Sequence, residues 1–104
     1  MFIADLHNDV LQRAMIGEDI SIRTNHGHSD LIRLRDSCID LEVFVVWING
    51  KDFIEGSFKR ANKLYDKLEA LEKENNFIKI TKSVGDINRA KNNNILSTPV
   101  SIEG

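Results

Sequence analysis

Residues 4–10, which read ADLHNDV, carry the side chains of this sequence that are best suited to chemistry. Asp5, His7 and Asp9 occupy every second position directly after the apolar opening at residues 1–3. In an extended chain, alternate side chains project from one face, so these three would point the same way at the end of a strand. An imidazole and a carboxylate placed in this way can bind one divalent cation, because zinc accepts both donors at about 2.0 to 2.2 Å.

Two ligands are too few for such a site, and the sequence offers a third at its last apolar segment. Residues 95–104 end in Glu103. Because parallel sheets place the carboxyl ends of their strands at one edge, we expect Glu103 to reach the same edge as His7 and Asp9. The spacing leaves a plainer alternative open. Asp5 and Asp9 could cap a helix, and His7 could be a hydrogen-bonded residue at a strand end.

The elements that must position these side chains alternate between strands and helices. Periodicity, capping residues and breakers predict strands over residues 1–6, 41–48 and 95–102, with a short strand possible at 77–80. Pro99 lacks a backbone N–H, so pairing in the last strand is expected from Val100 to Ile102. Helices are expected after Asn8 or Asp9, over 30–37 after a cap at Ser29 or Asp30, over 53–74, and after a capping box formed by Ser83 and Asp86. This order is typical of an α/β fold with a parallel sheet and right-handed crossovers.

Composition restricts the function classes. The chain has 104 residues, 41% of them apolar and 29% charged, with a net charge of −2. These values indicate at most one domain and give no electrostatic reason to expect nucleic acid or an anionic membrane as a partner. No apolar run approaches the roughly 18 residues of a membrane span. The single cysteine, Cys38, cannot form an internal disulfide, so we expect a cytoplasmic protein.

Three segments resemble the N-terminal third of the membrane (renal) dipeptidase family, zinc peptidases of the amidohydrolase-like barrel class. They are DLHNDVL, HSDLIRLRDSCIDLEVFVVWI and VSIEG, in that order, and the resemblance is weakest over residues 51–97. It implies that His7 and Asp9 bind one metal ion, that Glu103 bridges two, and that Asp5 supports the ligands without binding. Leu6 stands where many members have Gly, and Pro99 interrupts the third strand.

The resemblance further implies the N-terminal portion of a (β/α)8 TIM barrel, comprising the first two or three βα units. Residues 1–104 would then be the N-terminal fragment of a single metal-dependent hydrolase domain, without a second domain. The whole protein would be a dipeptidase with two zinc ions, in which a metal-bridging hydroxide attacks the dipeptide and Glu103 is catalytic. The remaining ligands would lie beyond residue 104, so the fragment alone is expected to be inactive. Its bare sheet edges predict a homo-oligomer.

Two alternatives from other classes stay open. The chain could be a non-catalytic binding or self-assembling α/β module, or it could belong to another binuclear metal hydrolase, such as an amidase or a phosphoesterase. The pair His26 and His28 lies in a predicted loop, which favours a loop role over metal binding. Trp47 is expected to pack in the core rather than to line a substrate pocket. Cys38 is expected to be buried and not to act as a nucleophile.

Overall fold

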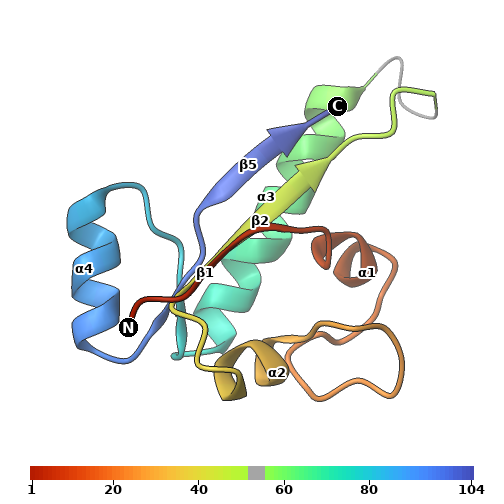
Figure 1. Ribbon diagram of the computed structural model, residues 1–104. Coiled ribbons are helices and arrows are strands. Elements are labelled where there is room, and N and C mark those ends of the chain that lie inside the picture. Colours follow the sequence, from red (N-terminus) through yellow and green to blue (C-terminus); the bar gives the residue numbers. More distant parts are fainter. Residues whose placement is uncertain (52–55) are drawn as a thin grey trace.

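The strands form one parallel sheet (Figure 1). The computed structural model describes residues 1–51 and 56–104. Strand β2 is central, with β1 on one side and both β4 and β5 on the other, while β3 pairs with β4. This topology confirms the predicted α/β fold with parallel strands. The strands are β1 (Ala4–Asn8), β2 (Leu41–Trp47), β3 (Ile78–Lys79), β4 (Leu96–Ser97) and β5 (Val100–Glu103).

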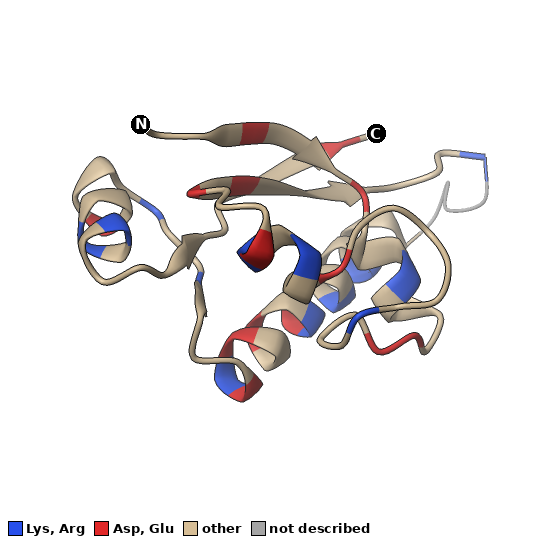
Figure 2. Cartoon of the chain, turned by 60° about the horizontal axis from the view of Figure 1, so that its bottom comes forward, with Lys and Arg blue, Asp and Glu red and all other residues tan. Residues whose placement is uncertain are grey.

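Helices α1 (Leu11–Met15), α2 (Leu31–Asp36) and α3 (Ser57–Glu74) cover one face of this sheet (Figures 1 and 2). Helix α4 (Val84–Asn92) lies to the side and contacts β4 (Figure 1). Figures 1 and 2 show α1, α2 and α3 on the same side of the sheet, and α1 and α3 also contact each other. Within the described residues, no element lies on the opposite side of β1, β2 and β5 (Figure 2). None of the described helices is long and apolar enough to cross a membrane.

The core lies between the sheet and these helices. From β2 it takes Phe44 and Val46, and from the residue after the strand Ile48; these alternate along the chain, as one face toward the helices requires. Burying each large apolar side chain stabilises the fold by about 1.5 to 3 kcal/mol. Packing in the core therefore contributes more to the stability of these helices than their intrinsic helix propensity does. Its buried members are Val10, Leu11, Ala14, Ile20, Leu31, Leu34, Phe44, Val46, Ile48, Leu64, Leu68, Leu71, Ile78 and Leu96.

The predicted long helix is confirmed as α3, which begins at Ser57 after Gly56. Its expected start at Phe53 lies outside the described residues. The helix buries Leu64, Leu68 and Leu71 at spacings of four and three. Its first turn does not join this stripe, since the side chain of Phe58 is 82% exposed.

The first helix begins differently from the prediction. Val10 occupies the N-cap position of α1 and makes no side-chain capping bond. The side chain of Asn8 accepts a hydrogen bond from the Val10 N–H (2.9 Å), and Asp9 turns toward His7 instead of capping the helix. Strand β1 consequently extends to Asn8, two residues beyond the predicted end. The expected capping role of Asn8 or Asp9 is therefore wrong.

The last strand is interrupted as Pro99 predicts. Strands β4 and β5 pair with different parts of β2, separated by residues 98 and 99. The proline nitrogen donates no bond, but the Pro99 carbonyl accepts one from the Phe44 N–H (3.0 Å). The predicted caps of the two later helices also form: Asp30 caps α2, and the Ser83 hydroxyl accepts a bond from the Asp86 N–H at the start of α4.

Asp30 does more than cap a helix. It is fully buried, and its carboxylate accepts bonds from the N–H groups of Arg33 (2.8 Å) and Thr24 (3.1 Å). The Arg33 guanidinium forms an ion pair with the same carboxylate and also donates to the Thr24 carbonyl (2.9 Å). This one side chain therefore joins the loop before α2 to the helix itself.

Replacing Asp30 with alanine should lower the free energy of unfolding by about 2 to 4 kcal/mol, because the change removes a cap and leaves a partly buried guanidinium without its partner. Urea unfolding of the full chain measures this change. Asp36→Ala is the matched control, since Asp36 forms an exposed ion pair with Arg23 whose loss should cost less than about 1 kcal/mol. Equal losses in the two variants would contradict the role given to Asp30.

Candidate metal centre

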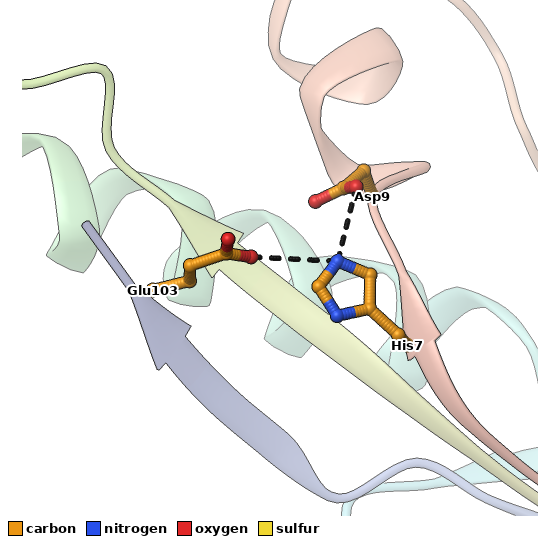
Figure 3. A group of neighbouring side chains, drawn as sticks. All are labelled: His7, Asp9 and Glu103. Carbon is orange, nitrogen blue, oxygen red and sulfur yellow. Dashed lines mark hydrogen bonds and ion pairs between the residues drawn. The ribbon is translucent and has the colours of Figure 1, made fainter.

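Three predicted site residues meet at the carboxyl edge of the sheet (Figure 3). His7 lies on β1, Asp9 directly follows this strand, and Glu103 ends β5, two strands away. The Nε2 atom of His7 lies 3.2 Å from Oδ2 of Asp9 and 3.4 Å from Oε2 of Glu103. The expectation that Glu103 reaches the same edge as His7 and Asp9 is thus met in the fold.

The geometry of this group suits a cation. A single imidazole nitrogen carries at most one hydrogen, which cannot serve two carboxylates with good geometry. Two donor atoms that each lie about 2.1 Å from a tetrahedral ion are about 3.4 Å apart, close to the separations found here. The ligand atoms of His7, Asp9 and Glu103 all lie within 4.8 Å of one another, and no other such group occurs in the described part of the chain. The side chains are about half exposed, so the position is open to solvent.

A shift of register in β1 aims the His7 side chain. Asp5 pairs with Glu42, but the next pair joins Asn8 to Phe44, so β1 holds one residue more than β2 over this interval. Such a bulge redirects side chains locally. The Asp5 carboxylate accepts a bond from the His7 N–H (3.1 Å), so it stabilises the backbone of the bulge rather than the imidazole ring. Asp5 therefore contacts the main chain of His7 and not its ring, and its support of the metal ligands stays a prediction.

The backbone of Glu103 is fixed by its neighbours on β2. Glu103 pairs in register with Trp47, and its carbonyl accepts a bond from the Ile48 N–H (2.9 Å). At Gly104 the backbone has φ of +148°, and a Cβ atom would lie 2.8 Å from the Ile48 carbonyl oxygen. A larger residue would have to displace β2, so glycine at this position lets the strand end close against its neighbour.

An open cavity of about 550 Å³ lies beside the trio of His7, Asp9 and Glu103. Its lining includes Trp47 and His28 together with the trio. The side chain of Trp47 is 40% exposed, so the expectation that it packs in the core is wrong. Trp47 ends β2 on the face opposite Phe44 and Val46, where no described helix covers it.

The two remaining histidines separate. His28 lines the cavity, whereas His26 pairs with Glu18 (3.1 Å) and does not line it. The H-x-H pair therefore does not act as a unit in this fold.

Cys38 is exposed, contrary to the expectation of burial. The chain leaves α2 through a left-handed turn at this residue, with φ of 58°.

Arg13 organises the loop beside the cavity, and nothing in the sequence pattern singles it out. Its guanidinium donates to Glu18 (2.7 Å) and to the carbonyls of Ser29 (2.8 Å) and His26 (2.9 Å). Gly27, with φ of +74°, lies so close that a Cβ atom would be 2.3 Å from the guanidinium. The loop is therefore fixed to α1 by one side chain.

Glu42 is a buried carboxylate within the apolar run of β2. Its side chain is fully buried, and among the described residues neither oxygen has a hydrogen-bond partner of good geometry. Burial raises the pKa of Glu42 to about 7; the nearby amide of Asn8 opposes this shift, and the negative charge of Asp5 adds to it. The group is therefore a source of pH-dependent instability close to β1.

Comparisons with known proteins identify a family for this chain and solved structures with the same fold. The family model described as membrane dipeptidase (peptidase family M19) matches residues 1–104. A search of curated proteins gave no match.

Two solved structures share the fold over the whole chain. One is a metallopeptidase of family M19 called dipeptidase AC, with 19% sequence identity and a TM-score of 0.85. The other is a metallopeptidase from Rhodobacter sphaeroides with a bound phosphinate mimic of the dipeptide L-Ala-D-Ala, with 16% identity and a TM-score of 0.84. Both matches include all of the present chain, but they span only 35% of the dipeptidase AC chain and 38% of the Rhodobacter sphaeroides chain.

The raised pKa of Glu42 predicts a pH-dependent loss of stability. The unfolded chain ionises Glu42 near pH 4.5, whereas the folded chain resists ionisation until about pH 7. Stability should therefore fall as the pH rises through this interval, by roughly 2 to 3 kcal/mol. Glu42→Gln removes the charge and should unfold at higher urea concentration than the wild type at pH 8, with little difference near pH 4.5. A difference between the two proteins that does not change with pH would refute this assignment.

Proposed function

Since this chain belongs to the membrane dipeptidase family, peptidase family M19, we propose that it forms the metal-binding N-terminal part of a zinc-dependent dipeptidase. The observation that carries this proposal is the convergence of one imidazole and two carboxylates, from strands far apart in the sequence, at the edge of a parallel sheet. Active sites of barrels built from such strands lie at this edge.

The donor set of His7, Asp9 and Glu103 fits a divalent cation. His7 and Asp9 would hold one ion, and the second oxygen of Glu103 would be available to another, as the resemblance to the family implies. Bound in this way, the ions would bring the pKa of a coordinated water toward 7 and polarise the carbonyl of the scissile bond. The carboxylates of Asp9 and Glu103 would offset part of the cationic charge and fix its position, while Asp5 keeps the His7 backbone in place.

A dipeptide is the substrate class that we propose. The Rhodobacter sphaeroides metallopeptidase binds a phosphinate mimic of L-Ala-D-Ala, and it shares the fold of this chain. The cavity of about 550 Å³ beside the trio has the size of a small-molecule site. Its mixed lining, with the indole of Trp47 and the polar side chains around the trio, suits a short peptide that has both apolar and charged groups.

Exposed apolar side chains on the outer strands of the sheet support the proposal that residues 1–104 are part of a single (β/α)8 barrel domain. Leu6 and Ile102 are 71% and 78% exposed on the outer strands β1 and β5. In a closed barrel, further strands would pair with such edges and cover such side chains. Cytoplasmic location and homo-oligomeric assembly stay predictions from the sequence.

The purified full-length protein should contain about two zinc ions per chain and should hydrolyse dipeptides such as L-Ala-D-Ala or L-Ala-L-Ala. His7→Ala and Asp9→Asn should each lower zinc content and reduce kcat/KM by about a hundred-fold or more, since each removes a direct donor. Glu103→Gln should affect both ions, because it weakens the bridge. Elemental analysis measures the zinc content, and chromatographic separation of the released amino acids measures the hydrolysis.

His26→Ala and Asp36→Asn are the matched controls, because both residues are exposed, lie outside the trio and do not line the cavity. Both variants should keep their zinc and their activity. Full activity in His7→Ala would exclude this residue as a ligand. Hydrolysis of phosphoesters or simple amides, without hydrolysis of dipeptides, would replace the proposed substrate by that of another binuclear hydrolase.

A further inference from the structure

Most polar side chains that line the cavity are already engaged within the chain. Gln12 donates to the Trp47 carbonyl (2.8 Å), and Asn8 donates to the Ser29 hydroxyl (2.9 Å). Arg13, the cation of the lining, is neutralised by Glu18. The carboxylates of Asp9 and Glu103 both face His7.

His28 and the indole N–H of Trp47 are the exceptions. Among the described residues, neither side chain has a hydrogen bond or ion pair, although both line the cavity. An imidazole offers one donor and one acceptor when neutral and two donors when protonated. Of the two, His28 therefore provides the group that can adapt to either a donor or an acceptor on a bound molecule.

The backbone on both sides of His28 is held in place. The Arg13 guanidinium binds the carbonyls of His26 and Ser29, the positions that lie two residues before and one residue after His28. Next to His28, the left-handed conformation of Gly27 brings the chain against the guanidinium. On the other side, the Ser29 hydroxyl accepts a hydrogen bond from Asn8, the residue between His7 and Asp9. The loop thus presents His28 from a fixed base, which lowers the entropy lost when it binds a ligand.

We propose that His28 contacts the substrate and donates a hydrogen bond to a carboxylate or carbonyl oxygen of the bound dipeptide. This inference rests on the proposed dipeptidase function and adds a binding residue to it. Because His28 belongs to the loop and not to the trio, it acts on substrate affinity and leaves the metal ligands unchanged. Trp47 supplies the apolar side of the same cavity.

The test compares His28→Ala, His28→Gln and the control Asn25→Ala in the full-length protein. Asn25 is an exposed residue of the same loop that does not line the cavity. Each variant is assayed for zinc content, for kcat and KM on L-Ala-D-Ala, and for affinity to a phosphinate dipeptide analogue by calorimetry. We expect His28→Ala to raise both KM and the Kd of the phosphinate by about tenfold, the value of one hydrogen bond, with zinc content unchanged. His28→Gln should recover part of this loss, and Asn25→Ala should match the wild type.

Two results would overturn the inference and leave the proposed function standing. One is an active wild type whose KM and phosphinate affinity change less than twofold in His28→Ala. The other is a loss of zinc in that variant, which would make His28 a ligand instead. A wild type that binds zinc but hydrolyses no dipeptide would overturn the proposed function and, with it, this role of His28.

Discussion

The candidate site depends on one arrangement, in which two carboxylates approach the same imidazole nitrogen. The carboxylates of Asp9 and Glu103 lie 3.2 and 3.4 Å from the same nitrogen, Nε2 of His7, and the single hydrogen that this nitrogen can carry cannot serve both of them. A bound cation would supply the positive charge that one imidazole cannot. The parallel register of β1, β2 and β5 makes the meeting possible, because it brings a residue from each end of the chain to one edge.

Much of this arrangement follows from local sequence rules. The alternation around His7, the apolar run of β2 and the position of Pro99 predict parallel strands whose ends carry the polar residues, and the structure has this form. Asp30 and Ser83 act as the caps that their positions predict. These features depend on residues close to one another in sequence, so a pattern can reveal them.

Features that depend on contacts between residues far apart in the sequence could not be predicted from sequence patterns. The bulge in β1 arises from the pairing of Asp5 and Asn8 with β2, and Asp9, directly after this strand, faces His7 instead of capping α1. Trp47 is exposed at the cavity end of β2, whereas Val45 on the same face is fully buried, and periodicity cannot decide this for a strand apolar on both faces. Arg13 is one of several arginines in the sequence, and only the fold shows that it binds the loop carrying His28.

Stability and chemistry make opposing demands on this sheet. The helix-covered face packs a continuous core, whereas His7, Asp9 and Glu103 at the site edge are half exposed, and β2 holds the buried carboxylate of Glu42. Hydrogen bonds to Arg13 and Asp30 hold the loop that lines the other side of the cavity. The site is therefore placed by secondary structure on one side and by a single ordered loop on the other.

Anomalous diffraction at the zinc absorption edge, from crystals of the full-length protein grown with zinc, would locate the bound metal. We expect a strong peak about 2.0 to 2.2 Å from Nε2 of His7 and from a carboxylate oxygen of Asp9, with Glu103 bound to this ion and to a second peak nearby. A map with zinc bound elsewhere, and with no peak between these three side chains, would contradict this expectation.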